Sequence, residues 1–196
     1  VLPPEEYTQF VNNPKFTGIR VEQVLQYPDG RPGFYFIRLA YSDQAKALFA
    51  AERAELLRPI SESYTMDGQI VTITHPRFGA GQLKDMLDGD AFTLINAPTI
   101  NPMVLDFVFS TPRALAGVTL ITGSLADFTV TVAVYPPGGG QPKTYSQHFV
   151  ALPPDPTTRV NFEPSPTQAA RVRVEIHDNV SPEDSVNIHV RELQFH

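Results

Sequence analysis

The side chains best suited to bind an ion gather in one short acidic turn, Leu-Asp-Gly-Asp-Ala-Phe-Thr-Leu, which starts at residue 87. The carboxylates of Asp88 and Asp90 stand there beside the hydroxyl of Thr93. The glycine between the two acids tolerates positive φ, and an Asp side chain bonds readily to its own nearby backbone. Carboxylates, hydroxyls and free carbonyls are the oxygen ligands that Ca²⁺ prefers. The spacing is also that of a plain polar turn on a β-sandwich, which is the more ordinary interpretation, and both stay open here.

An acid in the last apolar segment is the second unusual feature. Apolar residues alternate with polar ones from 186 to 190, as in a strand with one buried face. The next inward position is Glu192, yet Leu193 and Phe195 continue the apolar row one place out of phase. Such a phase change predicts a β-bulge. A carboxylate left unpaired at the end of a core is costly, so Glu192 needs a partner.

A single structural Ca²⁺ would account for both features by joining the acidic turn to the last strand. Ca²⁺ takes six to eight oxygens, so backbone carbonyls would complete the set. The alternative is an ion pair between Glu192 and Arg173 or Arg191, with the turn merely solvated. The expected side-chain ligands are Asp85, Asp88, Asp90, Thr93 and Glu192.

Motifs for catalysis are missing from the sequence. The absence of cysteine excludes disulfides, zinc–cysteine sites and thiol catalysis. The sequence contains neither a serine in a nucleophile elbow nor an HExxH motif. His75 precedes Pro76 at the end of a predicted strand, where a hydrogen-bonded or surface role is the more ordinary one. We therefore expect a protein that is not an enzyme.

Composition narrows the class further. The chain has 196 residues, 42% of them hydrophobic, with 19 prolines and a net charge of −6, which indicates a globular, turn-rich protein. It has no basic cluster, so nucleic acid and anionic membrane surfaces are unlikely partners. No apolar run approaches the roughly 20 residues that span a bilayer. The Val1 start suggests a mature secreted chain or a domain cut from a longer protein.

Residues 1–79 have the pattern of a small α+β subdomain. A short helix is predicted over 4–12, a hairpin over 19–41 with Pro-Asp-Gly at its turn, and a longer helix over 43–57. Ser42 or Asp43 can cap the longer helix. A further strand is expected over 63–75.

Residues 80–196 are expected to form a jelly-roll β-sandwich, so the fold class is mostly β with a small N-terminal α+β subdomain. Predicted strands recur between Pro and Gly turns, and two of them alternate clearly, at 128–134 and 172–176. Alternation means one buried and one solvated face. Residues 70–75 can supply an eighth strand. The predicted core includes Phe107, Val130, Val132, Val174 and Ile188.

This arrangement resembles the galactose-binding-like sandwiches, which include discoidin, coagulation factor type C domains and bacterial carbohydrate-binding modules. The resemblance covers about residues 80–196 and rests on the Asp-Gly turn at Asp88, on Thr93, on the strands that follow, and on Glu192 in the closing strand. Leu94 and Ile95 stand where the family has Trp, and the chain contains no Trp. The resemblance implies a calcium site in a similar position and ligand loops at one end of the sandwich.

The function implied is that of a non-catalytic glycan-binding module on an extracytoplasmic protein of a bacterium. The acidic C-terminal part favours a neutral or basic glycan over an anionic one. The alternative is a structural or interaction domain of a larger envelope protein, such as a membrane-bound glycosyltransferase, whose membrane domain would then be its partner. The candidate ligand-binding residues are Asn96, Tyr145, His148 and Asn179.

Overall fold

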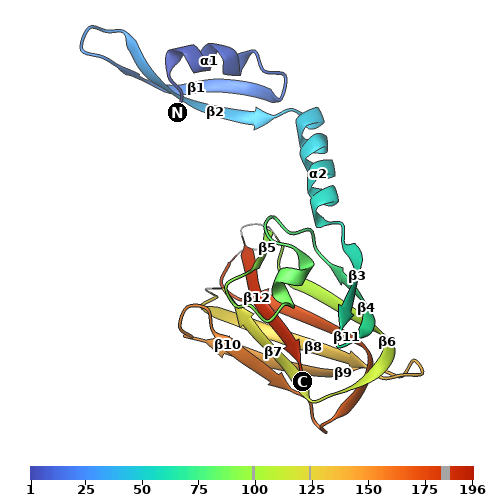
Figure 1. The fold of residues 1–196 in the computed structure, drawn as a ribbon. Coiled ribbons are helices and arrows are strands. Elements are labelled where there is room, and N and C mark those ends of the chain that lie inside the picture. Colours follow the sequence, from blue (N-terminus) through green and yellow to red (C-terminus); the bar gives the residue numbers. More distant parts are fainter. Residues whose placement is uncertain (99, 124, 182–185) are drawn as a thin grey trace. The chain divides into compact units, whose positions relative to one another are not determined.

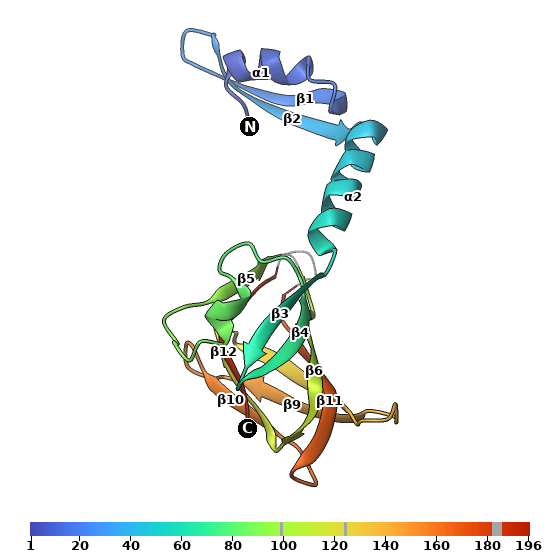
Figure 2. The same cartoon turned by 45° about the vertical axis from the view of Figure 1, so that its right-hand side comes forward.

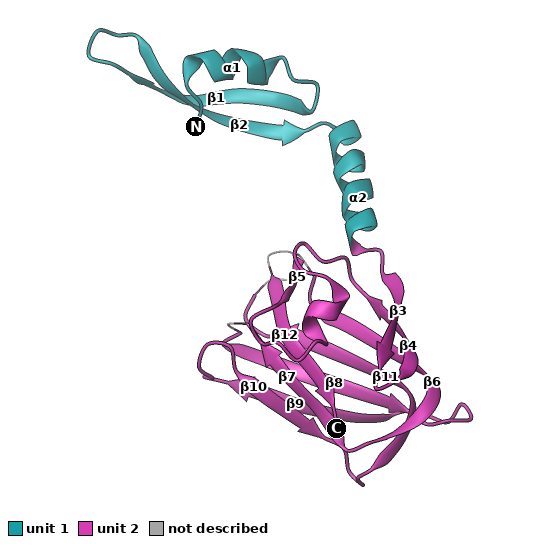
Figure 3. Cartoon of the chain, viewed as in Figure 1, with its two compact units in different colours: residues 1–56 teal, residues 57–196 magenta. Residues whose placement is uncertain are grey.

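The computed structural model of the chain describes residues 1–98, 100–123, 125–181 and 186–196, shown from two directions in Figure 1 and Figure 2. The chain forms two compact units, Val1–Leu56 and Leu57–His196, coloured separately in Figure 3. Each unit is described by itself below. No helix among the described residues has the length and apolar character needed to cross a membrane.

The predicted boundary between residues 79 and 80 is wrong. Strands β3 (Ile60–Met66) and β4 (Gln69–His75) belong to the second unit, because β4 pairs with β6 (Met103–Leu115) through Val71–Phe109 and Thr74–Asp106. The prediction that residues 70–75 supply a strand of the sandwich is confirmed. Local patterns indicated a strand here but could not show that its partner lies some thirty residues further along the chain.

The first unit is a hairpin with a helix packed on it. Helix α1 (Pro4–Val11) rests on strands β1 (Phe16–Gln26) and β2 (Pro32–Tyr41) through stacked rings. Tyr7 stacks on Tyr35 at 4.4 Å, and Phe10 stacks on Phe16 at 4.2 Å. Helix α2 (Asp43–Leu57) follows as the longest helix of the chain, as predicted. The Ser42 hydroxyl accepts a hydrogen bond from the Ala45 N–H at 3.2 Å and so caps α2.

The second unit is a sandwich of two antiparallel sheets (Figure 1). One sheet has the strand order β10-β7-β12-β5, and the other has the order β3-β4-β6-β11-β8-β9. A short 3₁₀ helix, η1 (Leu83–Met86), precedes β5 (Ile95–Pro98). The remaining strands are β7 (Gly117–Thr122), β8 (Asp127–Tyr135), β9 (Lys143–Val150), β10 (Thr157–Asn161), β11 (Thr167–Asp178) and β12 (Asn187–Phe195).

The core lies between the two sheets. All five core residues named from the sequence are fully buried in one hydrophobic cluster. On β8, buried and partly exposed residues alternate along the whole strand, which is the period expected when one face of a sheet packs inward. The fold-class prediction of a mostly β sandwich with a small α+β part is confirmed.

The predicted bulge in the last strand is also confirmed. The pairing of β12 with β7 shifts register between Val190 and Glu192. As a result Glu192 and Leu193 are both buried, while Arg191 is partly exposed.

Candidate functional site

An oxygen-rich cluster lies where the acidic turn meets β12. Its centre is the Thr93 hydroxyl, whose Oγ1 lies 2.8 Å from the carbonyl oxygens of both Asp85 and Asp90. The two carboxylate oxygens of Asp88 lie 3.3 and 3.4 Å from the same Oγ1. A hydroxyl has one proton to donate, and here it faces four acceptors. The cluster therefore contains more lone pairs than protons.

Local hydrogen bonds decide which oxygens of the turn face this cluster. The Asp85 carboxylate accepts from the Gln82 N–H at 2.8 Å and caps η1, so Asp85 contributes its carbonyl. The Asp90 carboxylate accepts from the Phe92 N–H at 2.9 Å, so Asp90 also contributes its carbonyl. Gly89 adopts a φ of 79°, the left-handed conformation that glycine allows. The Asp88 carboxylate also accepts a local hydrogen bond, from the Asp90 N–H at 2.9 Å, but both of its oxygens lie within 3.4 Å of the Thr93 hydroxyl. The predicted ligands that present their side chains are therefore Asp88, Thr93 and Glu192.

Glu192 reaches the turn from β12 and is only 4% exposed. Its Oε2 accepts from the Gly89 N–H at 3.0 Å, while its Oε1 is buried and has no hydrogen-bond partner. Burial raises the pKa of the Glu192 carboxyl, and the nearby charges of Asp88 and Asp90 raise it further. The arginines considered as ion-pair partners are engaged elsewhere, since Arg173 pairs with Glu175 at 2.8 Å and Arg191 with Asp155 at 3.0 Å.

These oxygen ligands are of the kind that a hard cation prefers. Among the described residues, no three His, Asp or Glu side chains converge on a metal-sized site, so backbone carbonyls would have to supply several ligands. Mixed carboxylate, hydroxyl and carbonyl oxygens suit Ca²⁺ better than a transition metal, which favours nitrogen or sulfur ligands. The orphaned Glu192 Oε1 is the observation that points to a positive charge in the cluster.

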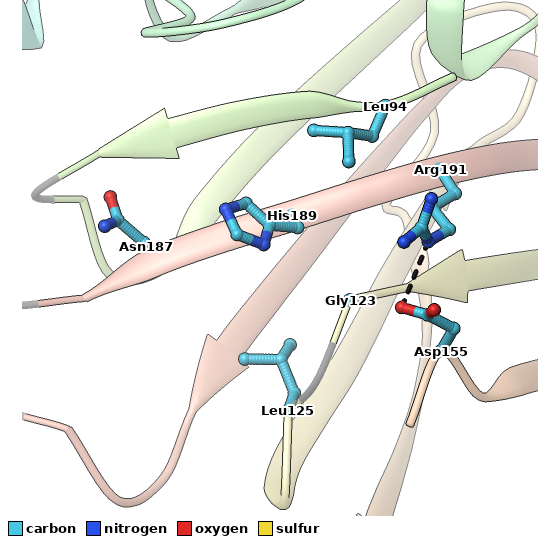
Figure 4. Close-up of a pocket in the computed structure, with 7 residues that line it drawn as sticks. All are labelled: Leu94, Gly123, Leu125, Asp155, Asn187, His189 and Arg191. Carbon is cyan, nitrogen blue, oxygen red and sulfur yellow. Dashed lines mark ion pairs between the residues drawn. The ribbon is translucent and has the colours of Figure 1, made fainter. Parts of the chain in front are cut away.

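A pocket of about 340 Å³ lies on the face of the four-stranded sheet that points away from the core (Figure 4). Asn187, His189 and Arg191 project into it from β12, at the positions that alternate with the buried residues of that strand. Leu94 stands on one side, while Gly123, Leu125 and Asp155 stand on the other. Hydrogen-bond donors and hydrogen-bond acceptors therefore share the pocket with apolar side chains.

Gly123 is needed for the shape of this pocket. A Cβ built on Gly123 would lie 2.6 Å from the Cβ of His189, closer than two such atoms can stand. The Gly123 N–H also donates to the His189 carbonyl at 2.9 Å. The glycine thus lets the loop after β7 approach β12 and leaves the imidazole facing the pocket.

The four ligand-binding residues predicted from the sequence lie in three places. Asn96 is the cross-strand partner of His189, next to the pocket, and its Oδ1 is buried without a hydrogen-bond partner. His148 and Asn179 meet at Asp127 at the end of the other sheet, each 2.7 Å from its Oδ1. Tyr145 stacks on Phe162 at 4.9 Å and donates its hydroxyl to a backbone carbonyl, so it packs against the core.

The sequence reasoning missed the polar residues of the pocket. The available signal was the run Asn187-x-His189-x-Arg191, which occupies the outward positions of the last strand. Taken alone, the run is an ordinary solvent-facing row of a strand. It becomes part of a pocket because Gly123 and Asp155, from two other connections, lie against it.

Comparison with solved structures identifies the class of fold. A family 32 carbohydrate-binding module of AlyQ, solved with 4,5-unsaturated mannuronic acid, matches with a TM-score of 0.51 and 12% identity over 69% of this chain and 98% of that chain. The family 32 module of C. perfringens NanJ, solved with galactose, gives the same TM-score, identity and coverage. The fold is therefore the galactose-binding-like β-sandwich of carbohydrate-binding modules, as the sequence resemblance implied. No family model and no curated protein matches the sequence.

Proposed function

We propose that the protein is a non-catalytic glycan-binding module carried on an extracytoplasmic protein. The observation that supports this most directly is the pocket on the four-stranded sheet, which combines polar side chains with apolar walls. Its volume of about 340 Å³ is at the small end of the range for ligand sites, which suits a ligand the size of a monosaccharide.

The pocket chemistry matches a sugar. Hydroxyl groups of a sugar both donate and accept hydrogen bonds, and His189, Arg191 and Asn187 offer donors beside the acceptor Asp155. Leu94 and Leu125 can pack against the C–H face of a pyranose ring, in a protein that has no Trp to stack on it. Because Asp155 neutralises Arg191, the pocket favours a neutral glycan.

The oxygen cluster is proposed to hold a structural Ca²⁺. The Asp88 carboxylate, the Glu192 carboxylate, the Thr93 hydroxyl and the carbonyls of Asp85 and Asp90 would hold it. The ion would supply the positive charge that the cluster lacks and would hold the acidic turn against β12. No chemical step is assigned to it.

The test is a glycan array followed by calorimetry on the best ligand. His189→Ala should weaken binding at least tenfold, because it removes a donor or acceptor aimed into the pocket. His148→Ala is the matched control, since this histidine lies at the end of the other sheet and should leave affinity unchanged. Loss of binding in the control but not in His189→Ala would move the site to the Asp127 cluster. An array without any bound glycan would favour the structural or interaction domain instead.

A further inference from the structure

Two consecutive residues of β12, Arg191 and Glu192, each hold the acidic turn by a hydrogen bond to its backbone. Glu192 accepts from the Gly89 N–H on the side of the oxygen cluster. Arg191 lines the pocket, and its Nη1 donates to the Ala91 carbonyl at 3.2 Å. The β-bulge sets both residues opposite Ile121 of β7, because the register passes from Val190–Thr122 directly to Glu192–Ile121. The turn is therefore in contact with both the oxygen cluster and the pocket.

Arg191 is held by two partners that come from different connections. Its Nε forms an ion pair with Oδ1 of Asp155, in the segment between β9 and β10, at 3.0 Å but without hydrogen-bond geometry. The Ala91 carbonyl holds the other end of the guanidinium. A planar guanidinium bound at two points has little rotamer freedom left. The orientation that Arg191 presents to the pocket thus depends on where the Ala91 carbonyl lies.

We infer that a cation bound in the oxygen cluster positions Arg191 in the pocket and thereby raises the affinity for glycan. Ala91 follows Asp90, whose carbonyl faces the cluster, and lies two residues before Thr93, whose hydroxyl forms its centre. A cation there fixes the backbone on both sides of Ala91, and the Ala91 carbonyl then fixes Arg191. The inference rests on the proposed glycan function and adds its regulation.

Thermodynamic linkage makes the effect reciprocal. If the cation raises glycan affinity by some factor, the glycan must raise cation affinity by the same factor. Couplings of this kind commonly amount to about fivefold or more. We expect glycan affinity to fall at least about fivefold when a chelator replaces calcium. We expect calcium affinity to rise by the same factor at saturating glycan.

The experiment measures glycan affinity by calorimetry with calcium and with chelator in three proteins. The wild type should show the calcium dependence. Arg191→Met should bind glycan more weakly than the wild type does. Its glycan affinity should be the same with calcium and with chelator, although the variant still binds calcium. His189 lines the same pocket but has no hydrogen bond to the turn. His189→Ala should therefore bind glycan more weakly yet keep the calcium dependence. Equal wild-type affinities in both conditions, or a calcium dependence retained in Arg191→Met, would overturn the inference.

A second measurement needs neither a variant nor a glycan. The Arg191 Nε–H resonance in ¹⁵N NMR spectra of the wild type should shift when calcium is added. A resonance that stays in place at saturating calcium overturns the coupling, whatever the array shows. If the resonance shifts but no glycan binds, the proposed function fails while the calcium control of Arg191 stands.

Discussion

Two polar clusters hold loops to the sandwich, and they differ in whether each acceptor finds a proton. At the end of the six-stranded sheet, Asp127 Oδ1 lies 2.7 Å from both the His148 ring and the Asn179 amide. The side-chain amide oxygen of Asn179, Oδ1, in turn lies 2.9 Å from Nδ1 of His177. In the acidic turn, four acceptors surround the single hydroxyl proton of Thr93, and one oxygen of Glu192 has no partner.

The comparison indicates that the number of hydrogen-bond donors, more than the number of acids, distinguishes a self-sufficient polar network from a candidate ion site. Donors of the protein close the Asp127 cluster, and a closed polar network is stable by itself. In the acidic turn the Glu192 Oε1 is left without a donor, and buried polar atoms without partners are costly. The proposed cation would supply a positive charge beside this oxygen.

Calcium addition should produce the largest effect. A ligand that binds only the folded state stabilises it by about 2.7 kcal/mol at one hundred times its Kd, so the melting temperature should rise with calcium and fall with chelator. Asp88→Ala should abolish the rise. Asp127→Ala is the matched control and should keep the rise at a lower starting temperature. A melting temperature indifferent to both additions would show that the Glu192 cluster needs no cation.

Glu192→Gln should stabilise the metal-free protein and remove its response to calcium. Burial raises the pKa of the Glu192 carboxyl and disfavours its charged form in the folded state, whereas an amide of the same shape carries no charge. The gain should be about 1 kcal/mol or less, because the charged carboxylate also accepts a hydrogen bond from the Gly89 N–H. Urea unfolding in chelator measures it. Glu175→Gln, which breaks a surface ion pair with Arg173, should give no gain, and a loss in Glu192→Gln would contradict the argument.

The two clusters should respond to pH in opposite directions in the metal-free protein. Hydrogen bonds from Asn179 and His148 lower the pKa of Asp127. Its contribution to stability is therefore full above the ordinary pKa of Asp and is lost as the pH falls through the lower folded value. The pKa shift of Glu192 is upward, opposite to that of Asp127. The contribution of Glu192 to stability is therefore full below the ordinary pKa of Glu and is lost as the pH rises through the folded value.

Urea unfolding in chelator from about pH 3 to 7 tests these signs. Asp127→Asn should flatten the loss of stability on the acid side. Glu192→Gln should flatten the loss at higher pH. Identical pH profiles for the wild type and both variants would remove the proposed contrast.

Asn179→Ala should produce the smallest effect. The substitution removes one donor to Asp127, but His148 and the exposed position of the carboxylate leave it with other partners. The urea midpoint should fall by less than about 0.5 M, and the response to calcium should not change. A large fall would mean that the Asp127 network carries more of the stability than its exposure indicates.

Much of the fold could be predicted because strand periodicity is a local property. The alternation of residues 128–134 and 172–176 predicted which side chains are buried, and the phase change after Val190 predicted the bulge. The domain boundary could not be predicted, because it depends on contacts between residues far apart in the sequence. The pairing of β4 with β6 is a long-range contact, and the local pattern of residues 69–75 does not reveal it.

The sequence by itself determined the acidic turn, the bulge and the acid that follows it, since each depends on residue types a few positions apart. The folded structure was needed to see that the carbonyls of Asp85 and Asp90 and the carboxylate of Asp88 face the Thr93 hydroxyl, while the Glu192 carboxylate faces the Gly89 N–H. Only the tertiary structure brought Asp155 and Gly123 against His189 and Arg191 to make a pocket. The physical reason is that sheet order and the distribution of hydrogen-bond donors depend on which distant strands and loops pack together.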